Sequence, residues 1–381
     1  MQGLLNPVTQ SFAIGLSGLR LTASQGVALP TTNITDATTL YATPFLFDGI
    51  GLPISSTGPW KVISPGEKSV AVPSTNFRLF DVFGYLSGGT LDLEAVNWNQ
   101  STYTINAFTA GTQTFTTSAV HGLAIGNFVG ITSVVGTVGT SATLGANGRF
   151  WQIKTVPTTT SFTVEGSNWA ALAYTSGGTL YTIPNTRVTA LTTLNGVSVK
   201  TGETNKVYLG TGMTNGGGES AASPTTGQLD DSTGFRGLWN NYNRVPRALL
   251  FSPGSTSHTY TATTVRFYNN LPSGRLVVVV GVQVEPILLG CTAGFQYITT
   301  PGTGTQMARL VIQETLDGST AWATGGSIVN FVGTANTIRI TGTAPIAVPN
   351  AGFNFFPLTE SVDGGLTGNY DFGRAFGSIA A

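Results

Sequence analysis

Two histidines and one cysteine have the most versatile side chains in this sequence, and their positions argue against a metal or thiol site. His121 and His258 lie far apart, and neither belongs to an HxH or HExxH pattern, the spacings that bring two imidazoles to one zinc ion. Cys291 has no neighbouring histidine that could activate its thiol. We therefore expect no metal, no cofactor, and a Cys291 that packs as a small apolar residue.

Two carboxylate pairs could in principle cleave a glycan. Asp92 and Glu94 alternate with leucines, which predicts a strand that carries both acids on one face, roughly 7 Å apart, within the roughly 5–10 Å that glycosidases use. Many solvated strand faces meet the same spacing. Asp230 and Asp231 end a Gly/Ser-rich stretch and are expected in a solvated turn. Without a GxSxG or phosphate-binding pattern, we expect no catalytic residue and no enzyme.

The segment 235–245, Phe-Arg-Gly-Leu-Trp-Asn-Asn-Tyr-Asn-Arg-Val, combines aromatic, amide and arginine side chains. Exposed, such a set makes a platform for carbohydrate; packed, it makes a subunit junction, the interpretation that we favour. The apolar residues near the N-terminus are the other candidates for a contact with a neighbour. The candidate interface or glycan-contact residues are Phe12, Ile14, Leu16, Arg236, Trp239, Asn240, Tyr242 and Arg244.

The composition excludes several partners. Charged residues are 9% of the 381, with 17 basic and 17 acidic side chains, so the basic surface that nucleic acid requires is missing. A net charge near zero favours association. The longest apolar run, from residue 276 to 289, is interrupted by Gln283, Glu285 and Pro286 and falls short of the roughly 20 residues of a membrane-spanning helix. We expect neither nucleic acid nor membrane as a partner, and we expect a homo-oligomer, a trimer.

The pattern along the chain is almost wholly that of an all-β protein. Thr, Val, Ile, Tyr and Phe are dense, and Gly, Pro, Asn and Ser interrupt them about every ten residues. Ser87-Gly88-Gly89 predicts a hairpin turn, and the apolar run 275–282 predicts a strand buried on both faces. One short helix is expected around 238–242.

Four regions follow from these patterns. Residues 1–20 form an apolar arm, or alternatively a first edge strand. Residues 103–184 are rich in Thr, Gly, Ser and Val and nearly free of charge, which indicates a small inserted β-module. Residues 21–102 and 185–290 are expected to form the main, jelly-roll-like β-sandwich, and 291–381 a C-terminal β region.

Two segments of the chain resemble phage proteins. The inserted module follows an "HGL" pattern, with a Gly-led V-x-I strand, an aromatic strand and a closing T-F-T-V, in residues 114–123, 126–131, 148–156 and 160–164. It resembles a small β-module common in phage tail and adhesin-type proteins. The flanks, joined across the insert, resemble a virion β-domain family of tail-fibre-tip or head-decoration type. Its R-F-L-W-N-Y-Y-N-R-V signature is similar to residues 235–245, with Gly237 and Asn241 as departures.

The family resemblance spans roughly 17–102 and 186–290. It implies a non-enzymatic structural protein of a tailed phage, exposed on the virion surface. The arm and the weakly charged composition favour an oligomeric capsid decoration, or cement, protein that binds the major capsid protein and stabilises the head. The alternative is a tail-fibre or adsorption protein that binds a host surface glycan.

Overall fold

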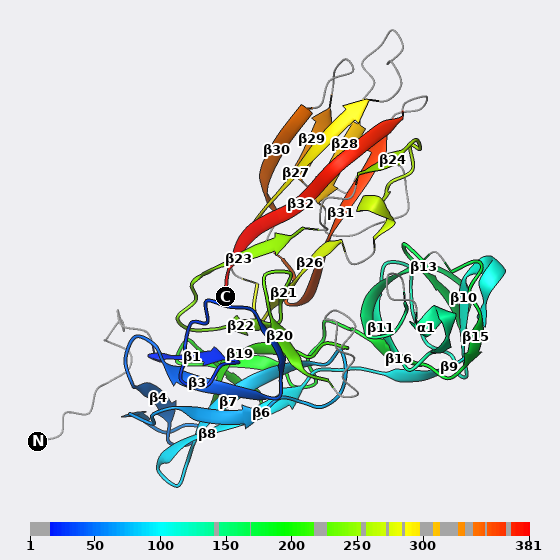
Figure 1. Ribbon diagram of the computed structural model, residues 1–381. Coiled ribbons are helices and arrows are strands. Elements are labelled where there is room, and N and C mark those ends of the chain that lie inside the picture. The colour runs from blue at the N-terminus through cyan, green and yellow to red at the C-terminus, as the bar shows by residue number, and fades with distance from the viewer. Residues whose placement is uncertain are drawn as a thin grey trace, which may run out of the picture.

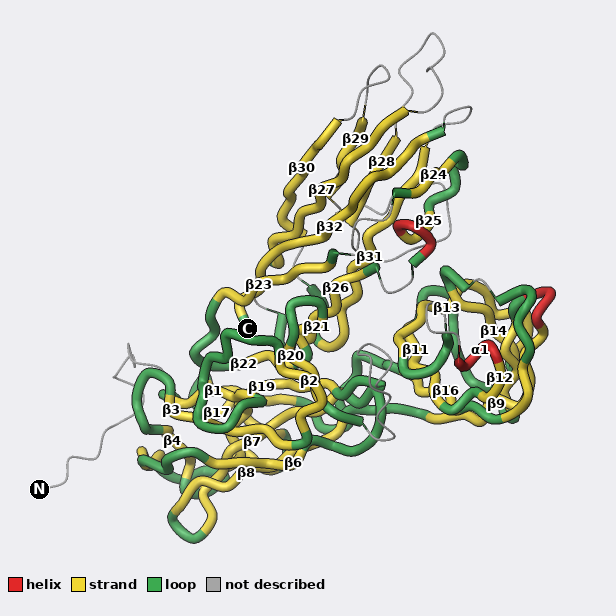
Figure 2. Tube along the Cα trace, viewed as in Figure 1, coloured by secondary structure: helices red, strands yellow, loops and turns green. Residues whose placement is uncertain are grey.

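The computed structural model describes residues 16–140, 145–167, 169–216, 227–252, 257–271, 274–283, 286–297, 308–312, 327–331, 338–346, 349–362 and 367–381. The chain is all-β, as predicted, and the helical segments in these ranges are single turns: α1 (Thr137–Thr140), η1 (Ala110–Thr112) and η2 (Tyr268–Asn270). Figure 1 shows three bodies, which we call the base, the barrel and the sandwich. In Figure 2 strands fill all three.

The base contains the first strands of the chain and those that follow the barrel. Its largest sheet has the order β17-β18-β19-β7-β8, with β22 paired to β19, beside a β1-β3-β6 sheet and a β4-β5 hairpin. The strands are β1 (Leu19–Thr22), β3 (Thr39–Pro44), β4 (Ile50–Pro53), β5 (Trp60–Ile63), β6 (Lys68–Ala71), β7 (Leu79–Ser87), β8 (Thr90–Asn97), β17 (Leu191–Leu194), β18 (Val197–Lys200), β19 (Glu203–Met213) and β22 (Leu238–Asn240).

The β7–β8 hairpin shows how local sequence determines the structure of part of the base. Ser87 pairs with Thr90 across a turn, and Gly88 and Gly89 have φ values of 56° and 88°, a left-handed pair that glycine adopts without strain. Beyond the turn, Leu91 is buried and Asp92 exposed, as the alternation predicts. The expected hairpin is therefore confirmed, and it directs the apolar face of β8 into the core.

The barrel is closed on itself in the order β10-β14-β13-β11-β16-β9, and all its strands come from the segment between Thr102 and Thr182. It has its own core of side chains, which includes Phe115, Trp151 and Trp169. The strands are β9 (Thr102–Thr109), β10 (Thr114–Thr117), β11 (Phe128–Thr132), β13 (Arg149–Thr158), β14 (Ser161–Val164) and β16 (Thr179–Thr182), with the small pair β12 (Val135–Gly136) and β15 (Tyr174–Ser176).

The "HGL" turn stabilises one end of the barrel. His121 is 3% exposed, and its Nδ1 accepts a hydrogen bond of 3.0 Å from the backbone N–H of Leu123. Burial lowers the pKa of His121, which favours the neutral imidazole that can accept this bond. Gly122 has a φ of 64°. His121 is therefore a structural turn residue.

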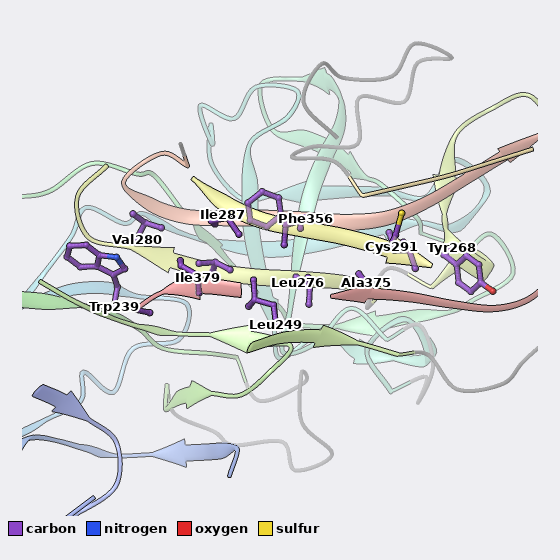
Figure 3. Packing of buried hydrophobic residues seen from close by; sticks show 14 of the residues in the cluster. Trp239, Leu249, Tyr268, Leu276, Val280, Ile287, Cys291, Phe356, Ala375 and Ile379 are labelled. Atoms are coloured by element: carbon purple, nitrogen blue, oxygen red, sulfur yellow. The ribbon is translucent and has the colours of Figure 1, made fainter. Parts of the chain in front are cut away.

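The sandwich packs two sheets face to face. One has the order β2-β20-β21-β26-β31-β28-β29, with β25 on β31, and the other β23-β32-β27-β30, with β24 on β32. The strands are β2 (Ile34–Ala37), β20 (Leu229–Asp231), β21 (Phe235–Arg236), β23 (Pro246–Phe251), β24 (His258–Tyr260), β25 (Arg266–Phe267), β26 (Arg275–Val280), β27 (Ile287–Tyr297), β28 (Ala308–Ile312), β29 (Ser327–Phe331), β30 (Ile338–Ile346), β31 (Gly352–Val362) and β32 (Gly368–Ala380). Side chains from both sheets meet between them (Figure 3).

Three expectations can be compared with these strands. β26 is buried along its whole length, as predicted, and Cys291 is 0% exposed in the core. The helix expected at 238–242 is wrong: Leu238–Asn240 is β22, held in the sheet by its pairing with β19. The expected boundary at 290 falls inside β27, because the strands from Pro246 onward pair with those near the C-terminus, a long-range choice that periodicity does not encode.

Substitution of Gly281 should disturb the contact between base and sandwich. A Cβ at this position would overlap the Tyr208 hydroxyl and the Trp239 ring. Overpacking of this kind costs about 1–3 kcal/mol, so Gly281→Ala should lower the urea midpoint of unfolding. Gly111, whose Cβ would meet no atom within 4 Å, is the control: Gly111→Ala should leave the midpoint nearly unchanged. Equal midpoints for the two variants would contradict this packing.

Candidate functional site

The three bodies meet at a buried ion pair between Asp81 on β7 and Arg187, which follows the barrel; we call it the junction pair. Arg187 Nε lies 2.6 Å from Asp81 Oδ2, and Nη2 lies 3.3 Å from Oδ1. The Asp81 side chain is 2% exposed and that of Arg187 15%. Arg187 Nη2 also donates to the carbonyl oxygen of Gly281 at 2.6 Å. One guanidinium, on the segment that leaves the barrel, therefore binds both the base and the sandwich.

Aromatic and hydroxyl groups enclose the junction pair. The Arg187 guanidinium lies 4.3 Å from the centre of the Trp98 ring and 5.6 Å from that of Tyr208. Thr211 Oγ1 donates to Asp81 Oδ1 at 2.6 Å. Burial raises the pKa of Asp81, and the hydrogen bonds from Arg187 and Thr211 oppose that shift. A charge pair so enclosed is suited to fixing an orientation, because removal of either partner leaves a buried charge uncompensated.

The barrel joins the base through two adjacent segments at this point. Trp98 and Arg187 form an antiparallel bridge, and Asn99 N–H donates to the Thr186 carbonyl oxygen at 3.1 Å. On the barrel side, the Phe150 ring stacks on Phe353 of the sandwich at 4.9 Å. The barrel is thus held by backbone pairing at its entry and by aromatic packing beside it.

A second buried cluster gathers three arginines around Asp231, and we call it the arginine cluster. Arg236 Nη1 and Arg247 Nη2 lie 3.3 Å and 3.1 Å from the two Asp231 oxygens. Arg20 Nη2 donates to the Ala381 carbonyl oxygen at 2.7 Å. Burial, with Arg247 nearby, lowers the pKa of Arg20 to about 10. Asp231 is 8% exposed and Asp230 3%, so the expected solvated turn at this pair is wrong. Asp231 compensates the arginines, and Asp230 Oδ1 accepts a hydrogen bond of 2.8 Å from the Asp36 N–H.

The residues of the 235–245 signature lie together, but inside the chain. Trp239 is 1% exposed and Asn240 2%, so neither presents a face to a ligand. Trp239 stacks with Tyr208 at 6.3 Å, and Arg244 lies 5.3 Å from its ring centre. The hollow beside Trp239, lined also by Val280, is no larger than a water molecule. An exposed carbohydrate platform at Trp239 is therefore ruled out.

The remaining candidate residues either make contacts within the base or lie outside the described ranges. Asn240 exchanges hydrogen bonds with the backbone of Leu21 at 2.7 Å and 3.2 Å, which ties β1 to β22. Tyr242 and Leu16 are partly buried against the core of the base. Phe12 and Ile14 lie outside the described residues.

The Asp92–Glu94 pair is divided between two contacts. Asp92 Oδ2 accepts from the Tyr85 hydroxyl at 3.0 Å. Glu94 binds Lys200 at 3.0 Å and Lys206 at 2.8 Å. Each carboxylate thus has its own partners on the sheet face, and the two do not converge on a hollow.

Sequence reasoning missed a third charged cluster, centred on Glu360 in β31. The Glu360 side chain is 0% exposed and lies 2.6 Å from His258 and 2.8 Å from Arg266. Register places Arg266 directly opposite Glu360, while His258 is 102 residues away in sequence. The one available signal was a single acidic residue inside the otherwise uncharged run 352–362. Like the other two, this cluster is closed and joins distant strands.

Two further properties of the described residues concern metal ions and membranes. They contain no group of three or more His, Cys, Asp or Glu that could hold a metal ion. None of the helices in the described ranges is long and apolar enough to span a membrane.

Comparisons with known proteins identify no relative in sequence. No family model matches the chain, and no curated protein matches it. Among solved structures, it is similar to dimeric latent PorU from Porphyromonas gingivalis, at 10% identity and a TM-score of 0.23, over 80% of this chain and 25% of that chain. It is also similar to the structure of infectious bursal disease virus Gx strain, at 14% identity and a TM-score of 0.22, over 93% of this chain and 69% of that chain. Likeness this weak supports no inference about fold or function.

Loss of the Arg187 charge should lower the stability of the folded chain. Arg187→Met leaves Asp81 buried without its partner, a change that costs about 3–5 kcal/mol. Lys61→Met is the control, because Lys61 is exposed on β5 and substitutions of exposed residues usually change stability by no more than about 0.5 kcal/mol. Calorimetry should show a clearly lower transition temperature for Arg187→Met alone. Similar transitions for both variants would show that the junction pair is not important for stability.

Proposed function

We propose that this chain is a non-enzymatic structural protein of a tailed-phage virion, an oligomeric decoration subunit that binds the major capsid protein on the head. The observation that carries the proposal is the use of its charged signature residues. Arg187 joins the base to the sandwich, and Arg236 pairs with Asp231 on a neighbouring strand, so these charges serve packing inside the chain.

A rigid subunit of this kind suits a mechanical role. A subunit that bridges neighbouring capsomers adds binding free energy to the assembled shell alone and so stabilises it. Fixed angles between base, barrel and sandwich keep several contact surfaces in place. Little conformational entropy is therefore lost when the subunit binds. In this proposal the base faces the particle, and the barrel projects at one side (Figure 1).

The surface chemistry agrees with a protein partner. With 17 basic and 17 acidic residues, long-range repulsion between copies is weak, and association is favoured. The resemblance of residues 235–245 to a virion signature points the same way. The glycan-binding alternative loses its main support, because Trp239 is 1% exposed.

Immunogold electron microscopy of intact particles tests the proposal. Antibody raised against the barrel, residues 102–182, should label the head, and an excess of purified protein should abolish the label. Label confined to the tail would replace head decoration with a role in adsorption. Particles without any label, from a stock in which the protein is expressed, would overturn the virion role altogether.

A further inference from the structure

Exposed apolar side chains lie around the β4–β5 hairpin: Leu46 and Phe47 before β4, Ile54 after it, and Val62 on β5. They are 64%, 37%, 51% and 63% exposed. Single exposed apolar residues are common, but a contiguous set marks an interaction surface. The question is therefore whether these four are contiguous and what covers them.

Two glycines leave room for apolar side chains on one face of this segment. Gly49, just before β4, and Gly51, within it, are two residues apart and share that face. A Cβ on Gly49 would lie 2.7 Å from the Phe47 ring, and one on Gly51 would lie 2.8 Å from Leu16 Cδ1. Val62 pairs directly with Gly51. Phe47, Leu16 and Val62 thus lie on one face, and we call these three residues the hairpin stripe. Ile54, three residues from Gly51, falls on the opposite face.

The chain enters the described structure at this stripe. Gly51 N–H donates to the Leu16 carbonyl oxygen at 2.9 Å, and Gly18 N–H donates to that of Gly49 at 2.8 Å, so residues 16–18 run antiparallel to β4. β4 ends at Pro53, two residues beyond Gly51. The fifteen residues before Leu16 can reach about 50 Å when extended. They are far too long for the remaining edge of their own hairpin.

The composition of residues 1–15, the arm, complements the stripe. It contains no Asp, Glu, Lys or Arg, and its apolar side chains are Met1, Leu4, Leu5, Val8, Phe12, Ala13 and Ile14. An uncharged apolar segment loses little solvation when an apolar surface covers it. We propose that the arm of one copy binds the hairpin stripe of a second copy, so that each copy donates one arm and accepts another. This rests on the oligomer of the proposed function but not on its capsid partner.

Cross-linking between two marked proteins tests the exchange. One full-length protein carries Ser11→Cys and a second, of different size tag, carries Val62→Cys; they are mixed and treated with a short bis-maleimide. Native Cys291 is 0% exposed and should stay unreactive. We expect a mixed cross-linked species, and none when Val120→Cys, at 62% exposure on the barrel, replaces Val62→Cys. Failure to form the mixed species, or a cross-link found only within one doubly substituted chain, overturns the proposal.

Self-association gives an independent measurement. Val62→Asp should weaken it at least tenfold in sedimentation equilibrium, whereas Val120→Asp should not change it. Unchanged association of Val62→Asp overturns arm exchange while leaving the virion role intact. Loss of head label from particles, together with intact arm cross-links, would overturn the capsid role and leave arm exchange standing.

Discussion

The buried pair of Asp81 and Arg187 is the constraint on which the arrangement of this protein depends. A charge inside a protein is tolerated when a partner and hydrogen bonds compensate it, and here the compensating groups come from both the base and the sandwich. Arg187 reaches Asp81 in the base and the Gly281 carbonyl in the sandwich, and Trp98 covers it at the barrel entry. Separation of the base from the sandwich would break the hydrogen bond from Arg187 to the Gly281 carbonyl oxygen and open the cover of the buried pair.

The same principle recurs at the other two buried clusters. Asp231 compensates arginines from β21 and β23, and Glu360 compensates groups from β24 and β25. In a chain with 9% charged residues, placing so many of them inside is a distinctive use of few charges. It leaves a weakly charged exterior, which agrees with a protein that is covered by neighbours.

The sequence was informative wherever the determining interaction is local. Alternation and glycine conformation predicted the β7–β8 hairpin, and continuous apolarity predicted β26. Pairing over long distances was not predictable: the strands around residue 290 follow partners near the C-terminus, and the set at 235–245 gave no sign of whether Trp239 faces solvent or core. The Glu360 cluster depends on the register of β25 and β31, which one sequence does not encode in any readable pattern.

Because Trp98 and Arg187 form an antiparallel bridge, the barrel is a domain that can be replaced by another. Its two ends leave the base side by side, so a different small domain can occupy the same position without altering the path of the main chain. The footprint that a replacement must reproduce is small and aromatic, because Phe150 and Phe128 pack on Phe353. Such an attachment lets the barrel diversify while the base that holds it stays constant.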